Sequence, residues 1–205
     1  MRSDKPSPPA GTQRGDAVRR RVIDAAERLL RERRADFSMR DLDAEAGVSF
    51  ATPFNQFGSK AAIMHALSER RIDTMTERYA RAHHPPDAAG RVLLAIDTAV
   101  AVMLEEAEVN RTVMGWIGTA GPTQGKAWAR STALWALALG AGEGLPESCR
   151  ERALRCMPRQ LAIAFRGALS FWTAGELPDE ALGRHARDIA TTLLRGFAEG
   201  EPPPR

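Results

Sequence analysis

The feature that most constrains this chain is a pair of short helical segments separated by a glycine. Ser38 precedes a segment that ends near Ala46, and Ser49 precedes a second one that runs to about Gln56. A serine before a helix can accept a hydrogen bond from a first-turn N–H that has no partner inside the helix. Gly47 lies between the segments and permits a left-handed backbone. Two short helices joined in this way form a helix-turn-helix.

Helical patterns flank this pair on both sides. Apolar residues recur at helical spacing from Val18 to Leu29, which predicts a first helix over residues 17–33. Ser59 precedes a long helix that should end near Ala82. Residues 1–15 are almost without apolar side chains, so we expect a disordered arm there.

Beyond residue 82 the pattern stays helical and shows no alternation typical of strands. Proline and glycine predict breaks at residues 85–86, 118–125, 140–146, 158 and 175–178. We therefore expect an all-α protein. Its parts are an arm (residues 1–15), a three-helix helix-turn-helix domain (16–62), a second helical domain (63–200) and a disordered tail (201–205).

The charge of the chain is unevenly distributed. Residues 1–60 carry 12 Lys and Arg against 9 Asp and Glu, which accounts for the whole net charge of +3. Such asymmetry suggests a polyanionic partner for the N-terminal part. A solvated arginine-rich helix face explains the same numbers, so charge alone leaves both interpretations open.

The composition excludes several other classes of protein. With 205 residues and 43% hydrophobic side chains, the chain can bury a core without disulfides or metals. It has no apolar run long enough to span a membrane and no apolar secretory signal, so we expect a cytoplasmic protein. Cys149 and Cys156 are too few for a disulfide framework; inert thiols are favoured over a redox sensor.

Four segments of the N-terminal part together resemble the DNA-binding domain of the tetracycline-repressor-like (TetR) family of transcription regulators. They are Val22–Leu30, Phe37–Leu42, Ala46–Ser49 and Phe54–Lys60, in matching order and spacing. The resemblance implies an all-α homodimer whose C-terminal domain binds a small molecule and controls affinity for DNA.

The second short helix has a face suited to base edges. Leu42, Ala46, Val48 and Phe57 should pack inward, which leaves Phe50, Ala51, Thr52, Asn55 and Gln56 outward. Asn and Gln can pair with adenine, and a Thr methyl or a Phe ring can contact the thymine methyl. Outside this context, exposed amides would more simply serve solubility.

The resemblance assigns phosphate contacts to Ser49, Thr52, Phe54 and Lys60, and Ser38 and Arg40 can make similar ones. Four positions depart from the family pattern: Asp43 for Ala, Phe50 for Lys, Pro53 for Leu and Phe54 for Tyr. These departures bear on which operator is recognised more than on DNA binding itself.

The C-terminal half offers two sets of candidate residues. Residues 158–197 should form two amphipathic helices placed like the dimerisation helices of the family, with interface candidates Leu161, Phe165, Leu169, Trp172, Ile189 and Leu193. Large soft or aromatic side chains could line an apolar ligand cavity: Met64, Met75, Tyr79, Met103, Met114, Trp116, Trp128 and Trp135. An intramolecular core explains both sets as well.

Other motifs point to no chemistry. Residues 120–126 imitate a phosphate-binding loop but lack the Ser or Thr that holds magnesium, and His83-His84 more simply ends a helix than binds metal. We find no catalytic motif, metal site or cofactor site, and expect no enzyme. The expected function is a ligand-responsive repressor of a palindromic operator in double-stranded DNA. The alternatives are a constitutive dimeric regulator and a helical scaffold or enzyme that retains a helix-turn-helix.

Overall fold

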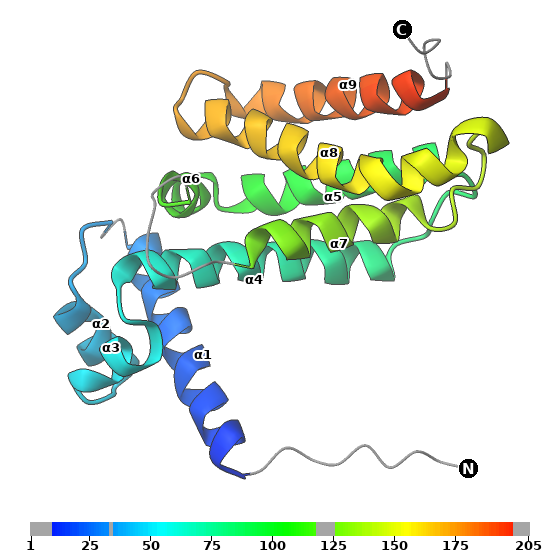
Figure 1. Ribbon diagram of the computed structural model, residues 1–205. Coiled ribbons are helices and arrows are strands. Elements are labelled where there is room, and N and C mark those ends of the chain that lie inside the picture. The colour runs from blue at the N-terminus through cyan, green and yellow to red at the C-terminus, as the bar shows by residue number, and fades with distance from the viewer. Residues whose placement is uncertain (1–9, 33–34, 118–125, 199–205) are drawn as a thin grey trace, which may run out of the picture. The chain divides into compact units, whose positions relative to one another are not determined.

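The computed structural model describes residues 10–32, 35–117 and 126–198, and their regular secondary structure is entirely helical (Figure 1). The helices are α1 (Ala10–Arg31), α2 (Met39–Ala46), α3 (Ala51–Phe57), α4 (Lys60–Arg81), α5 (Ala88–Glu105), α6 (Ala107–Gly115), α7 (Ala127–Leu139), α8 (Glu147–Thr173) and α9 (Asp179–Ala198). The predicted all-α class is confirmed. The chain divides into two compact units, Met1–Ile63 and Met64–Arg205, and α4 begins in the first and continues into the second.

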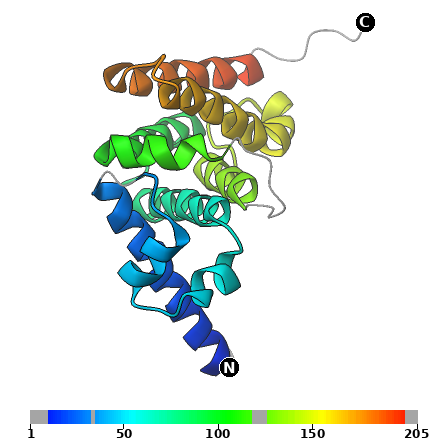
Figure 2. The same cartoon turned by 90° about the vertical axis from the view of Figure 1, so that its left-hand side faces the viewer.

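In the N-terminal unit, α2 and α3 pack on α1 (Figure 2). Of the residues expected to pack inward, Leu42, Ala46 and Phe57 are buried, whereas Val48 is only half-buried. A capping box opens α2: the Asp41 N–H donates to Ser38 Oγ at 3.1 Å, and the Ser38 N–H donates to Asp41 Oδ2 at 2.7 Å.

The turn after α2 has the backbone that the sequence predicts. Gly47 lies in the left-handed region, with φ 59° and ψ 46°. The guanidinium of Arg21 donates to the carbonyl oxygens of Ala46 and Gly47, each at 2.8 Å. These bonds satisfy carbonyls that the helix end leaves without backbone donors.

In the C-terminal unit, α8 packs against α6, α7 and α9, and α5 packs against α6, α7 and α9. Its largest fully buried side chains include Trp135, Trp172 and Ile96. Asn110 is also buried, and its amide donates to the carbonyls of Val102 and Met103 near the end of α5. The amide thereby replaces backbone partners lost where the chain breaks between α5 and α6.

Several predicted boundaries are wrong. The first helix begins at Ala10, so residues 10–15 are helical and not part of an arm; extending an existing helix costs little, even through polar residues. The predicted break at Pro158 is also wrong, because α8 continues through it. A proline inside a helix costs about 3 kcal/mol, and burial of neighbours such as Met157 and Leu161 offsets that cost.

The other predicted boundaries either agree with the structure to within one residue or lie outside the described residues. α3 begins one residue later than Ser49 alone would indicate, because Phe50 occupies the capping position and makes no side-chain capping bond. The expected breaks at 85–86, 140–146 and 175–178 do separate helices. The break expected at 118–125, the phosphate-loop-like residues 120–125, most of the arm and the tail lie outside the described residues.

Candidate nucleic-acid interface and ligand cavity

Helix α3 presents the face that the sequence assigns to base contacts. Phe50, Ala51 and Asn55 are exposed, whereas Thr52 and Gln56 are half-buried. Pro53 and Phe57 lie one turn apart on the opposite side and are buried. Pro53, which departs from the family pattern, therefore lies on the packed side of the helix and does not occupy the outer side.

Two aromatic rings dominate this exposed face. Phe50 is 56% exposed and Phe54 is 44% exposed, with ring centroids 6.0 Å apart. The guanidinium of Arg40, on α2, lies 5.9 Å from the centre of the Phe50 ring. An apolar surface beside a cation can contact thymine methyl groups while the cation meets a phosphate.

The polar residues proposed to contact phosphate differ in their availability. Ser38 and Ser49 are exposed, but Ser38 is already engaged with Asp41, and the Ser49 hydroxyl lies 2.7 Å from the hydroxyl of Thr52. In the Ser49–Thr52 pair one O–H remains free to donate to a phosphate oxygen, whereas the single O–H of Ser38 already donates to Asp41 Oδ2 at 2.8 Å. Asp43 faces inward, with Oδ1 buried and without a hydrogen-bond partner among the described residues.

Lys60 has a structural task that the sequence did not reveal. Its ammonium donates to the carbonyls of Ala35 at 2.7 Å and Phe37 at 2.9 Å, and lies 4.2 Å from the centre of the Phe37 ring. Burial lowers the pKa of Lys60 from the usual lysine value. The lysine thus fastens the segment before α2 to the start of α4.

Arginines of α1 also hold the unit together. Arg19 donates to the carbonyl of Gln56 at 3.0 Å and lies over the Phe57 ring, and Arg28 pairs with Glu45 at 2.5 Å. Together with Arg21, these residues bind α2 and α3 to α1. Part of the positive charge of residues 1–60 therefore belongs to side chains that stabilise the N-terminal unit.

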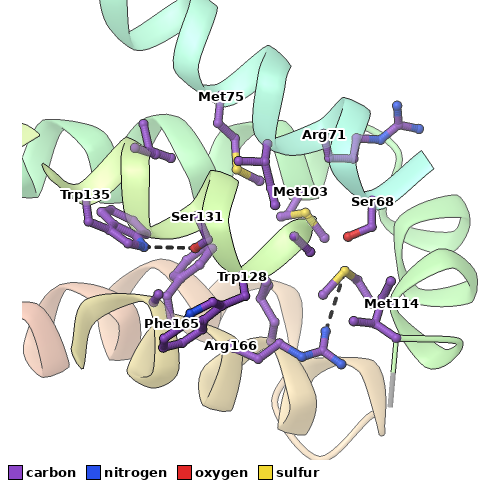
Figure 3. A pocket seen from close by; sticks show the side chains of 16 residues that line it. Ser68, Arg71, Met75, Met103, Met114, Trp128, Ser131, Trp135, Phe165 and Arg166 are labelled. Atoms are coloured by element: carbon purple, nitrogen blue, oxygen red, sulfur yellow. Dashed lines mark hydrogen bonds between the residues drawn. The ribbon is translucent and has the colours of Figure 1, made fainter. Parts of the chain in front are cut away.

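The C-terminal unit contains an apolar cavity of about 220 Å³ (Figure 3). Five of the candidate ligand residues line it: Met75, Met103, Met114, Trp128 and Trp135. The remaining lining residues are Ser68, Arg71, Ile72, Ile117, Ala127, Ser131, Leu134, Ala162, Phe165, Arg166 and Leu169. Trp128 is also 53% exposed, which places it at the mouth.

Three candidate ligand residues do not line this cavity. Met64 is fully buried, and Trp116 follows the end of α6 and is half-buried. Tyr79 is buried and stacks on His84 with ring centroids 4.5 Å apart, and burial raises the pKa of its hydroxyl. The prediction failed for these three residues because a large apolar side chain predicts burial but does not predict which part of the core surrounds it.

Sequence reasoning missed the two arginines of the lining. Arg166 follows Ala162 by four residues and precedes Leu169 by three, so helical spacing already places it beside apolar neighbours. That spacing could have indicated an arginine directed inward.

Most of the dimer-interface candidates are wrong. Leu161, Phe165, Leu169 and Trp172 are buried inside the C-terminal unit, so their side chains cannot meet a second copy. Ile189 and Leu193 are half-buried and pack against the same core. Amphipathic stripes identify burial but not the partner that covers them.

The exposed face of α8 carries other apolar side chains. Ile163 is 61% exposed and Phe171 is 59% exposed, at successive turns with Gly167 between them. A shallow groove continues from Gly167 and Phe171 to Ile189 on α9. The helix pair is thus apolar on this side as well as on its packed side.

Comparison with known proteins addresses the N-terminal part directly. Residues 22–67 match the model for bacterial regulatory proteins of the tetR family. This segment is similar to the N-terminal domain of those regulators. It contains α2, α3 and the aromatic face of α3.

The fold is also similar to that of a solved structure. A TetR transcriptional regulator from Rhodococcus sp. RHA1 superposes with a TM-score of 0.70 at 22% identity, over 87% of this chain and 97% of that one. A TetR-like transcriptional regulator from the same organism aligns with a TM-score of 0.48 at 19% identity, over 87% and 96%. No curated protein matches the chain.

The part of the chain that the structure describes holds no group of three or more His, Cys, Asp or Glu arranged to bind a metal ion. None of its helices is both long enough and apolar enough to cross a membrane. Cys149 is buried and Cys156 half-buried, and both are free thiols.

Proposed function

We propose that this chain is a homodimeric transcriptional repressor that binds a palindromic DNA operator and releases it when a small molecule occupies the cavity. The observation that carries the proposal is the exposed face of α3 within a segment that matches the tetR-family model. A major groove admits an α-helix, and exposed amide, hydroxyl and apolar groups can distinguish base pairs there.

Roles on the DNA follow from the chemistry of each side chain. Asn55 and Gln56 pair with adenine, and Phe50 with Phe54 contacts thymine methyl groups. Arg40, Ser38, Ser49 and Thr52 contact phosphates and fix the register of the helix. Lys60 contributes through the segment that it holds and adds positive charge near the backbone of the DNA.

Dimerisation uses the exposed side of α8 and α9. Ile163, Gly167 and Phe171 form an apolar strip, and glycine lets a partner helix approach closely. Two helices from each copy give a four-helix interface. A twofold dimer with recognition helices about 34–36 Å apart reads two half-sites on one side of the duplex.

Helix α4 offers a route from ligand to DNA. Ser68, Arg71, Ile72 and Met75 line the cavity from α4, and the same helix begins at Lys60, which holds the segment before α2. A ligand that binds more tightly when α4 is displaced shifts the population toward a conformation with lower affinity for the operator.

Selection from random double-stranded DNA with the full-length chain tests the proposal. We expect enrichment of a palindrome, and binding that weakens steeply with salt because phosphate contacts release counterions. Sedimentation of the same preparation should give a dimer. Failure to enrich any sequence would refute sequence-specific binding and favour a scaffold, whereas a palindrome that no ligand releases favours a constitutive regulator.

A further inference from the structure

The charges around the cavity do not balance. Among the residues that line it, Arg71 and Arg166 are cationic, and there is no aspartate, glutamate or histidine. The rest of the lining is apolar except for Ser68 and Ser131. The Ser131 hydroxyl already accepts a hydrogen bond from the indole of Trp135 at 3.1 Å.

Arg71 is compensated by its surroundings. Its Nε donates to Asn110 Oδ1 at 2.7 Å, and its Nη2 lies 3.7 Å from Glu106 Oε2. The amide of Asn110 is fixed in turn by two backbone carbonyls. The carboxylate of Glu106 and the amide of Asn110 already offset the cost of removing the Arg71 guanidinium from water, so Arg71 does not require a charged ligand.

Arg166 is different. Among the described residues it forms no ion pair, and its one polar contact is with the sulfur of Met114, at 3.7 Å from Nη1 (Figure 3). A thioether is a weak acceptor. Residues 118–125, which fall between the lining residues Ile117 and Ala127, contain no acidic side chain. Among the residues that the structure describes, no acidic side chain pairs with Arg166.

Partial burial makes this isolation costly. Arg166 is half-buried, and desolvation lowers its pKa, yet arginine remains protonated at neutral pH. A charge partly removed from water without a partner costs free energy, which a bound counter-ion offsets. A carboxylate is the smallest organic group that matches the planar, two-pronged donor geometry of guanidinium.

The remaining volume limits what the carboxylate can carry. A cavity of about 150 Å³ accommodates benzene, and the volume here is about 220 Å³. The body of the ligand is therefore one aromatic ring with a short side chain, or an aliphatic chain of similar size. Met75, Met103 and Phe165 offer it soft and aromatic surfaces.

We propose that the effector is a small apolar monocarboxylic acid whose carboxylate pairs with Arg166 and whose body fills the cavity. The proposal rests on the proposed function only in calling this molecule the effector. A neutral ligand of the same shape leaves Arg166 unpaired, and a cationic one adds repulsion. The site thus selects for charge at one end and for apolar surface over the rest.

The test compares acids with their alcohols on the whole chain of 205 residues. Octanoate and 3-phenylpropionate are titrated by calorimetry beside 1-octanol and 3-phenylpropan-1-ol. We expect at least one acid to bind tenfold or more tightly than its alcohol. Replacing Arg166→Met keeps the apolar volume and removes the charge, and we expect it to abolish that preference while leaving alcohol binding within about twofold.

Arg159→Met is the matched control, because Arg159 is exposed on the same helix. It should keep the preference of the unaltered chain. If Arg166→Met does not fold, as judged by circular dichroism, Arg166→Lys keeps the charge but loses the planar fork, and should bind the acid more weakly than the unaltered chain does.

Three results overturn the proposal: no acid binds at millimolar concentration, acids and alcohols bind equally, or Arg166→Met weakens both alike. Operator binding is measured separately on the same samples. A chain that binds its operator but prefers neutral ligands refutes the acid and leaves the proposed function standing. A chain that binds acids but selects no DNA refutes the proposed function and leaves the acid site standing.

Discussion

The surroundings of Arg166 differ from those of the arginines in the N-terminal unit. In the N-terminal unit, Arg19 and Arg21 donate to backbone carbonyls and Arg28 pairs with Glu45, so these cations fasten short helices to α1. In the C-terminal unit, Arg166 lines an apolar cavity beside a thioether. An arginine on a predicted surface can thus be structural, and one within an apolar stripe can mark a binding site.

The same contrast holds for apolar side chains. Phe54 on α3 and Phe50 just before it are exposed, and an apolar surface in water is unfavourable unless a partner covers it. On α8, Trp172 is fully buried while its neighbour Phe171 is exposed. Exposure therefore separates side chains that are available to a partner from those that are buried in the fold, even between adjacent residues.

Replacing Trp172→Ala should have the largest effect. Removing this buried ring should lower the free energy of unfolding by about 3–5 kcal/mol, measured by urea denaturation. Its indole also donates to Asp179 Oδ1 at 2.7 Å, a bond that the variant loses.

Phe171→Ala is the matched control one residue away. We expect the free energy of unfolding of the subunit to change little. The dissociation constant of the dimer, measured by sedimentation, should rise about tenfold. A strongly destabilised Phe171→Ala chain, or a Trp172→Ala chain that is as stable as the original, would contradict the assignment of the two faces.

Replacing Asn55→Ala should affect recognition without affecting stability. Loss of a bidentate contact with adenine should reduce discrimination at one position of the half-site by about 1–3 kcal/mol, measured by competition between operator variants. Arg40→Met is the comparison, since losing one phosphate contact should weaken binding to all sequences and lower the salt slope by about 1. Equal losses on every sequence for both variants would refute the division between base and phosphate contacts.

Replacing Arg21→Met should have a smaller effect on stability. The variant loses two hydrogen bonds to carbonyls at the end of α2, at a site that is exposed to water, so we expect a loss of about 1 kcal/mol. Arg20→Met removes the same charge from an exposed neighbour without such bonds and should be close to neutral. Thermal unfolding of both variants decides whether this charge supports the fold.

The sequence predicted those elements whose signals are local. Ser38 as a cap and Gly47 as a left-handed turn located α2, and the apolar spacing of α1 and α2 identified which side chains are buried there. Side chains that act at the helix ends, such as Arg21 and Lys60, were missed because their partners are distant backbone carbonyls that no sequence pattern specifies.

Tertiary context decided the rest. Pro158 continues a helix because buried neighbours offset its cost, and α5 ends at Glu105 without a glycine or proline to mark the break. The interface candidates failed for a related reason: Leu161 and Trp172 belong to one stripe of α8, but only packing decides whether that stripe meets the same subunit or another. The positions of Arg71 and Arg166 in the cavity lining likewise depend on how the helices pack.

Release of operator DNA by an apolar acid tests the central claim most directly. A fluorescent duplex carrying the selected palindrome is bound to the full-length chain, and its anisotropy is followed while the tightest-binding acid is added. We expect the unaltered chain and Arg159→Met to release the duplex, and Arg166→Met to retain it at concentrations at least tenfold higher. Release from Arg166→Met at the original concentration, or retention by the unaltered chain when the acid is saturating, would contradict the claim.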